Sequence, residues 1–207
     1  MLKLNRRAMI ALAAAATAAM SPALAEDTAA PAAGPGDFSI GAADAKVKIV
    51  EYASFTCPHC AHFHETVFGE LKKNYIDTGK VHFTLREVYF DRYGLLAAMV
   101  ARCGGDMRYF GIHDMLFAKQ SEWAASEDPA QVRENLKAIG LAAGIDQAAL
   151  DACLDDQGQA EAMIAQFEAN MAADEVKGTP TIIVNGTKYS NMTYEELAAI
   201  LDAELAK

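Results

Sequence analysis

The pattern of apolar and polar positions predicts two buried strands early in the chain, with a helix between them. Residues 47–53 and 81–88 are rich in β-branched and apolar side chains, which is typical of strands inside a sheet. Residues 61–73 repeat apolar side chains at helical spacing, so one face of that helix should be buried. The folded part therefore begins with a strand, a helix and a second strand.

The long stretch that follows favours helices alone. Asp128-Pro129 supports this, because Asp is a preferred N-cap and Pro suits the first helical position. We expect helices at residues 95–101, 107–119, 129–139, 146–154 and 159–172. The sequence thus predicts an α/β fold in which an all-helical segment interrupts the strands.

Strands return near the end of the chain. Residues 181–184 read as a strand, and Asn185-Gly186 is a type I′ turn signal that predicts a hairpin with a short partner strand. Thr193 and Glu196 have the spacing of a capping box and should open a final helix.

Two cysteines lie where the first strand gives way to the helix, in the motif Cys57-Pro58-His59-Cys60. At a helix start, free backbone N–H groups and the helix dipole favour an anion, so Cys57 should be a stabilised thiolate. An imidazolium at His59 would lower the pKa of Cys57 further. Pro58 suits the first turn, and Cys60, one turn inside the helix, should be the shielded, resolving thiol.

The same segment has an alternative interpretation as a metal site. His62 and His64 follow the motif and extend it to C-P-H-C-A-H-F-H, which suggests zinc or copper carriage. Consecutive helical positions spread around the helix axis, however, whereas convergent ligands need one face. We therefore predict no bound metal.

The amino terminus indicates export. Residues 1–25 contain a basic start, an apolar core and an A-x-A site that ends at Ala25, which together are typical of a cleaved signal peptide. The alternative, a retained membrane anchor, needs a longer apolar run. Cleavage after Ala25 would leave the protein in an oxidising space such as the bacterial periplasm.

Charge narrows the range of partners. Without residues 1–25 the chain keeps 15 basic and 28 acidic residues, a net charge of −13. Such an acidic chain is a poor partner for nucleic acid or anionic lipid. Residues 26–36 are rich in Ala, Pro and Gly and should form a flexible leader.

The motif, the helical insertion and the segment Gly178-Thr179-Pro180-Thr181 together resemble the DsbA family of periplasmic thiol:disulfide oxidoreductases. The resemblance covers residues 37–206. It implies a thioredoxin fold, discontinuous over residues 37–90 and 174–207, with an inserted helical domain at residues 91–173.

The resemblance also assigns further site residues. It implies that the Thr179–Pro180 bond is cis and faces the cysteines, where Thr179 and Pro180 would contact an extended substrate. Glu51 matches the family's buried acid beneath the disulfide, which can shuttle the proton of the resolving thiol. Lys80 is a candidate basic partner for that acid. The alternative for Glu51 is a solvated position on a strand edge.

Cys103 and Cys153 both fall in the helical insertion. Because the C-x-x-C motif claims one cysteine pair, these two remain for a second, structural disulfide. Such a pair also resembles a subset of the family. The alternative is two buried free thiols.

The leading functional hypothesis is a monomeric dithiol oxidase. Its Cys57–Cys60 disulfide would pass to reduced or unfolded exported proteins through a mixed disulfide. The resemblance implies reoxidation by a membrane quinone reductase like DsbB, and no bound cofactor.

Two alternatives remain open. The first is a disulfide isomerase or reductase. It is favoured by Thr179, because the oxidising prototype of the family has Val at this position and several isomerase relatives have Thr. The leader at residues 26–36 is short for the dimerisation domain of known isomerases. The other alternative is a non-catalytic chaperone or metal-binding protein.

Overall fold

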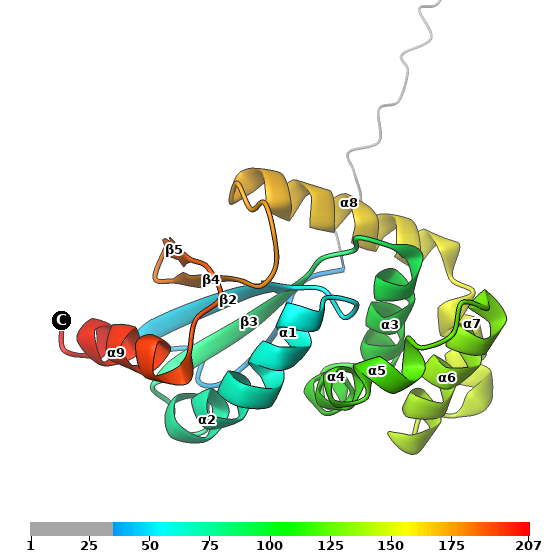
Figure 1. Ribbon diagram of the computed structural model, residues 1–207, viewed down its shortest axis with the longest axis horizontal. Coiled ribbons are helices and arrows are strands. Elements are labelled where there is room, and N and C mark those ends of the chain that lie inside the picture. Colours follow the sequence, from blue (N-terminus) through cyan, green and yellow to red (C-terminus); the bar gives the residue numbers. More distant parts are fainter. Residues whose placement is uncertain (1–34) are drawn as a thin grey trace, which may run out of the picture. The chain divides into compact units, whose positions relative to one another are not determined.

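A five-stranded mixed sheet lies at the centre of the described residues, 35–207, in the computed structural model (Figure 1). The strand order is β1-β3-β2-β4-β5, and only β2 and β3 run parallel. The strands are β1 (Phe38–Ile40), β2 (Val47–Ala53), β3 (Val81–Glu87), β4 (Thr181–Val184) and β5 (Thr187–Tyr189). The predicted strands are confirmed, whereas the three-residue edge strand β1 was too short to show a period in the sequence.

The predicted signal peptide and most of the predicted leader lie outside the described residues. Within residues 35–207, no helix combines the length and the apolar character that a membrane span requires.

One continuous helical segment connects β2 to β3. It consists of α1 (Pro58–Phe63), η1 (His64–Phe68), α2 (Gly69–Leu71) and η2 (Lys72–Ile76). It begins at Pro58, as predicted, and ends beyond the predicted residue 73. The two η elements are wide π-helical turns. Turns of this kind occur often at functional sites, and the first of them begins at His64.

Alternation along β2 gives the sheet two different faces. Ile49 and Glu51 are buried on the face that α1 covers, together with α9 (Tyr194–Leu205). Tyr52 points to the other face, where it packs in a small cluster with Phe167 of α8 (Gln157–Ala173). Figure 1 shows α8 and α1 on opposite sides of the strands. Period-two alternation therefore aims the Glu51 carboxyl toward the active-site helix.

The remaining helices pack together beside the sheet (Figure 1). They are α3 (Arg92–Cys103), α4 (Tyr109–Ala118), α5 (Gln120–Trp123), α6 (Pro129–Ala142) and α7 (Gln147–Leu154). Their buried side chains join those of the sheet in one continuous apolar core. The predicted α/β class with a helical insertion is therefore confirmed. The residue boundaries of the domains stay a prediction, and α8 lies against the sheet although its residues fall within the predicted insertion.

A buried ion pair connects the helices to the sheet. Arg102 of α3 lies 2.6 Å from the carboxylate of Glu87 at the end of β3, and both side chains are almost wholly buried. The hydroxyl groups of Tyr89 and Tyr109 donate to the same carboxylate at 2.6 Å. Because every carboxylate oxygen has a partner, the buried charge is compensated.

Local signals in the sequence form as expected. Asn185 and Gly186 both have positive φ angles, of 45° and 85°, as a type I′ turn requires. Thr193 and Glu196 form the reciprocal hydrogen bonds of a capping box at the start of α9. Asp128 caps α6 with Pro129 at the first helical position.

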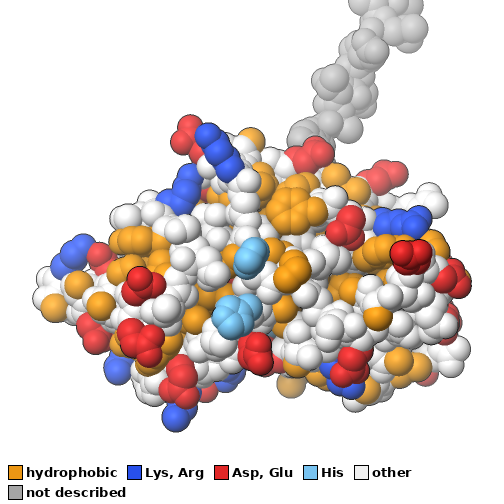
Figure 2. Space-filling model, viewed as in Figure 1, with side chains coloured by type: hydrophobic (Ala, Val, Ile, Leu, Met, Phe, Trp, Pro, Cys, Tyr) orange, Lys and Arg blue, Asp and Glu red, His pale blue; other side chains and the backbone are white. Residues whose placement is uncertain are grey.

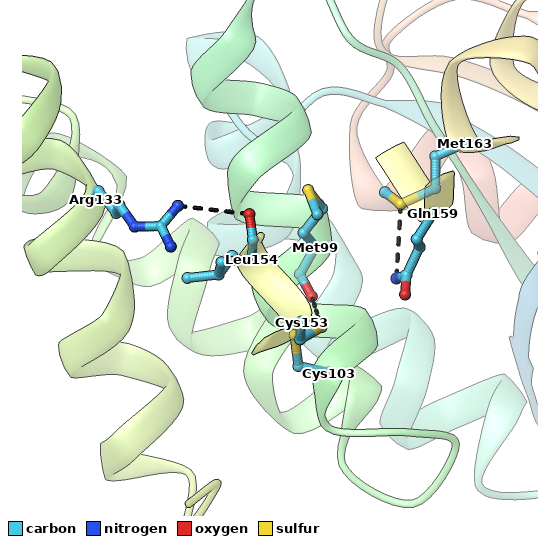
Figure 3. Close-up of a disulfide and its surroundings, with 7 residues drawn as sticks. All are labelled: Met99, Cys103, Arg133, Cys153, Leu154, Gln159 and Met163. Atoms are coloured by element: carbon cyan, nitrogen blue, oxygen red, sulfur yellow. Dashed lines mark hydrogen bonds between the residues drawn. A yellow bond between two sulfur atoms is a disulfide. The ribbon is translucent and has the colours of Figure 1, made fainter. Parts of the chain in front are cut away.

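The sulfur atoms of Cys103 and Cys153 are bonded in this structure, joining the end of α3 to α7 (Figure 3). Figure 3 shows Met99 and Leu154 next to the bond. The disulfide therefore closes a loop across the helical insertion, over a sequence separation of 50 residues.

We expect the double substitution Cys103→Ala and Cys153→Ala to lower the free energy of unfolding by roughly 4 kcal/mol, because the unfolded chain then regains the entropy of the open loop. Urea unfolding of both proteins under oxidising conditions measures the difference. Peptide mapping of the wild-type protein is the control. Unlinked Cys103 and Cys153 peptides, or equal stabilities, would contradict the prediction.

Candidate active site

The two motif cysteines occupy different environments at the start of α1. Cys57 is the N-cap residue, with extended backbone angles, and Pro58 follows at the first helical position. The Cys57 side chain is partly exposed, whereas Cys60 is fully buried. Both carry free thiols, so the structure describes the reduced site.

Hydrogen bonds to the Cys57 sulfur stabilise its anion. The largest influence is the hydrogen bond with the Cys60 thiol, and the pKa of Cys57 falls from its ordinary value of 9.0 to about 5. Partial burial opposes this fall, while the Thr179 side chain and the backbone N–H groups of Cys60 and His59 add to it. His59 is exposed and thus contributes through its backbone. At pH 7, Cys57 is therefore mainly a thiolate.

The second thiol is held in the opposite state. The hydrogen bond to Cys57, burial, and the nearby Glu51 carboxylate all raise the pKa of Cys60 far above its ordinary range. Cys60 therefore keeps its proton while Cys57 loses one. An exposed thiolate beside a buried thiol is the arrangement that directs an incoming sulfur to Cys57.

A loop from the distant end of the chain completes the exposed side of the site. The Thr179–Pro180 peptide bond is cis in this structure, directly before β4. The Thr179 carbonyl oxygen lies 3.6 Å from the Cys57 sulfur and accepts a hydrogen bond from it when Cys57 is protonated. The structure thus places Thr179 next to Cys57, with Pro180 following it.

Glu51 lies on the buried side and is fully enclosed. Burial raises the pKa of its carboxyl from 4.5 to about 8, although nearby His113 opposes the change when it is protonated. Its carboxyl faces the Nε2 atom of His64 at 3.1 Å. Lys80 instead donates to the carbonyl of Asn74, so the group that faces Glu51 is a histidine and not the lysine considered from sequence.

Sequence reasoning missed the helical residues that hold the active-site loop. Gln120 of α5 donates its side-chain amide to the carbonyl oxygens of Phe55 and Cys57, at 2.7 and 3.0 Å. Thr56 donates to Asp91, the N-cap of α3, at 2.7 Å. Asp91 directly before a helix is a local N-cap signal that can be recognised in the sequence. The contact between Gln120 and Cys57 spans 63 residues, and no local pattern in the sequence indicates it.

The histidines that follow the motif point in different directions. His59 and His62 are exposed, and Figure 2 shows histidine side chains on this face beside apolar ones. His64 is buried against Glu51 and stacks on Phe117. The motif cysteines and histidines therefore do not converge as a set of metal ligands.

A second group of titratable side chains lies behind His64. Within the described part of the chain, the ligand-type atoms of His64, His113 and Asp114 lie within 4.8 Å of one another. His113 contacts the Asp114 carboxylate through Nδ1 at 2.9 Å. Both histidines thus hydrogen-bond to a carboxylate, and we describe the group as a hydrogen-bonded cluster.

The sheet, the helical insertion and the paired cysteines at a helix start define a thioredoxin-fold protein with a dithiol site. A family model described as thioredoxin matches residues 33–203. Among solved structures, alpha-DsbA1 from Wolbachia pipientis is similar with a TM-score of 0.77 and 25% identity, over 83% of this chain and 92% of that one. BdbD from Bacillus subtilis is similar with a TM-score of 0.70 and 25% identity, over 84% of this chain and 97% of that one.

A candidate protein-disulfide oxidoreductase of Rickettsia bellii is 37% identical over 167 residues. That match covers 80% of this chain but 63% of the relative, so the chain spans less than two thirds of the relative's length. The chain belongs to the thioredoxin family and, within it, to the DsbA family.

We expect alkylation of Cys57 in the reduced protein to follow a titration with a midpoint near pH 5, because the anion is stabilised there. The rate of reaction with iodoacetamide between pH 3 and pH 9 measures it. Thr179→Val should move the midpoint upward, since the Thr179 side chain favours the thiolate. A wild-type midpoint near the ordinary value of 9.0 would contradict this picture of the site.

Glu51 should make stability depend on pH. The unfolded chain loses this proton near pH 4.5 and the folded protein near pH 8, so the cost of burying Glu51 grows as the pH rises between these values. We expect Glu51→Gln to raise the free energy of unfolding by roughly 1–3 kcal/mol more at pH 8 than at pH 5. Urea unfolding at both values measures this, with the exposed Glu65→Gln as control. Equal effects at pH 5 and pH 8 would disprove it.

Proposed function

We propose that this protein is a periplasmic thiol:disulfide oxidoreductase that donates the Cys57–Cys60 disulfide to exported proteins. The single observation that carries the proposal is the division of labour between an exposed, acidic thiol at Cys57 and a buried, basic thiol at Cys60. This division supplies a good leaving group on one side of the disulfide and a protected resolving thiol on the other.

The reaction proceeds through a mixed disulfide. A substrate thiolate attacks the Cys57 sulfur of the oxidised site, the bond to Cys60 breaks, and Cys60 takes up a proton. A second substrate thiolate then attacks the substrate sulfur, and Cys57 leaves as a thiolate. Two electrons pass from the substrate thiols to the protein, and the substrate gains one disulfide.

The electrostatics favour the oxidising direction. The hydrogen bonds to the Cys57 sulfur act on its anion, which exists only in the reduced protein. They therefore stabilise the reduced form and make the disulfide a stronger oxidant. The names of relatives support the same chemistry, since the Rickettsia protein is described as a candidate protein-disulfide oxidoreductase.

The Thr179 loop is the proposed docking position for substrate. Its backbone lies beside the partly exposed Cys57 sulfur, where an extended peptide can pair with it. The proposed clients are reduced or unfolded exported proteins. A DsbB-like quinone reductase in the membrane would return the site to its disulfide form, and residues 1–25 would direct the export.

One observation favours an isomerase or reductase instead. The backbone carbonyl of Thr179 lies 3.6 Å from the reacting sulfur, and a threonine before this proline departs from the oxidising prototype of the family. The direction of electron flow therefore has to be measured.

The test is equilibration of the purified protein with glutathione buffers from reducing to oxidising, followed by thiol trapping and mass spectrometry of Cys57 and Cys60. We expect the midpoint to lie well on the oxidising side of the glutathione couple, because the reduced form is stabilised. A midpoint at or below that couple would reject the oxidase and support the reductase or isomerase.

The matched control is Cys57→Ser, assayed with a reduced, unfolded client protein. An oxidoreductase loses all client oxidation in this variant, because the attacked sulfur is gone. A non-catalytic chaperone would keep its ability to hold the unfolded client. Wild-type protein that oxidises no client thiol, but still prevents client aggregation, would overturn the proposal.

A further inference from the structure

A row of titratable side chains leads from the buried side of the dithiol site to the surface. Glu51 of β2 is 0% exposed, His64 of η1 is 4% exposed, and His113 of α4 is fully buried. The next residue, Asp114, is 52% exposed. The row therefore begins at the enclosed carboxyl beside Cys60 and ends at a carboxylate in contact with solvent.

Each neighbouring pair in this row is in contact or nearly so. Glu51 and His64 share a hydrogen bond at 3.1 Å, and His113 and Asp114 share one at 2.9 Å. The imidazole rings of His64 and His113 meet edge to face, with centroids 4.4 Å apart. One ring nitrogen of His64, one ring nitrogen of His113 and one carboxylate oxygen of Asp114 lie within 4.8 Å of one another, a gap that one bridging water molecule spans.

Each imidazole keeps one nitrogen free for the next step. Among the described residues, neither Nδ1 of His64 nor Nε2 of His113 has a hydrogen-bond partner, although both atoms are buried. Burial lowers the pKa of His64 to about 3 and also lowers that of His113. Both rings are therefore neutral near pH 7, and a neutral imidazole accepts a proton at one nitrogen and releases one from the other.

Aromatic side chains enclose the rest of the row. His64 stacks on Phe117 with ring centroids 4.1 Å apart, and Phe68 lies 4.6 Å away. Such surroundings offer no site for a proton, so the histidines are the polar path through them.

The row opens into a cavity of about 670 Å³ between the active-site helix and α4. Its lining includes His64, Asp114 and Phe117. The other titratable groups that face it are His62, Glu65 and Lys72, all on the active-site helix. The cavity therefore connects the polar end of the row to solvent.

We infer that His64 is a positioning and proton-relay residue, which passes the proton of the resolving thiol between Glu51 and the His113–Asp114 pair. This inference rests on the proposed function and deepens it. It assigns a role in disulfide exchange to residues that do not touch the substrate.

Protons and electrons balance in the closing step of the exchange. With its pKa of about 8, Glu51 is ionised in a minor fraction of molecules at pH 7, and the step starts from that form. Cys60 gives its proton to the Glu51 carboxylate, and its thiolate attacks the Cys57 sulfur of a mixed disulfide. The bond from Cys57 to the departing thiol breaks, the Cys57–Cys60 bond forms, and the departing sulfur leaves as a thiolate.

Glu51 then returns to its ionised form by passing the proton to Nε2 of His64, which releases another from Nδ1 toward Nε2 of His113. His113 in turn releases a proton from Nδ1 toward Asp114. Donation of the disulfide runs these transfers in reverse.

The test isolates this step with Ellman's reagent. Reduced protein forms a mixed disulfide between Cys57 and the coloured thiol thionitrobenzoate, and attack by Cys60 then releases that thiol. Stopped-flow absorbance gives the rate of this release in buffers without imidazole. Cys60→Ser, which lacks the attacking thiol, verifies the assignment of the signal.

We expect His64→Gln to slow the release about tenfold or more at pH 7, because an amide keeps a hydrogen bond to Glu51 but does not carry a proton. On transfer from H₂O to D₂O, the release rate of His64→Gln should fall by a larger factor than the release rate of the wild type. The equilibrium constant of His64→Gln with glutathione should stay within about twofold of the wild-type value, since a relay changes a rate and not an equilibrium. Free imidazole should restore the rate of His64→Ala by entering the cavity.

Two further variants separate the relay from a structural role. Asp114→Asn changes an exposed side chain, so it keeps the fold intact and should slow the release in the same buffers. Glu65 lines the same cavity but lies outside the row, so Glu65→Gln should leave the rate of thionitrobenzoate release unchanged.

Three outcomes overturn the inference. The first is a wild-type rate of release in folded His64→Gln and Asp114→Asn. The second is a loss of rate in His64→Ala that free imidazole does not restore. The third is stoichiometric zinc or copper that the wild-type protein retains and His64→Gln loses. Failure of the proposed function is distinct, because it would show in the glutathione midpoint and in the client oxidation of the wild-type protein, whereas failure of the relay shows only in the rates of the variants.

Discussion

The negative charge on the Cys57 sulfur is the feature on which the rest of the site depends. It is favoured because Cys57 ends a buried strand and starts a helix, where the Cys60 thiol and backbone N–H groups point at the sulfur. The same geometry buries Cys60 and places Glu51 below it through the alternation of β2. One thiol is thus held as an anion and the other as a neutral group, only three residues apart. This asymmetry directs an incoming sulfur to Cys57, and the strand–helix junction produces it with few residues.

The helical insertion is part of the site. Gln120 holds the active-site loop through the carbonyl oxygens of Phe55 and Cys57, and Asp91 holds it through Thr56. The insertion also supplies His113 behind the cysteines. Because its core is continuous with that of the sheet, and the Arg102–Glu87 pair is buried between them, these contacts rest on a rigid support. A thioredoxin-like sheet alone would leave the active-site loop without Gln120 and Asp91, and His64 without His113 behind it.

Much of the fold could be predicted because its signals are local. The strands β2, β3 and β4, the hairpin at Asn185, and the capping box at Thr193 each depend on residues within a few positions of one another. The edge strand β1 could not be predicted, since its three residues become a strand only by pairing with β3. The extension of the active-site helix through two π-helical turns also left no trace in the period of its apolar residues.

The sequence by itself determined the α/β class, the dithiol motif at a helix start, and the resemblance that links this motif to Thr179 and Pro180. The tertiary structure decided which groups surround those thiols. It pairs Glu51 with His64 and not with Lys80, brings His113 and Asp114 behind them, and places Gln120 on the loop. The physical reason is range. Periodicity and capping act along neighbouring residues, whereas the pKa values of buried groups depend on contacts and desolvation between segments distant in the chain.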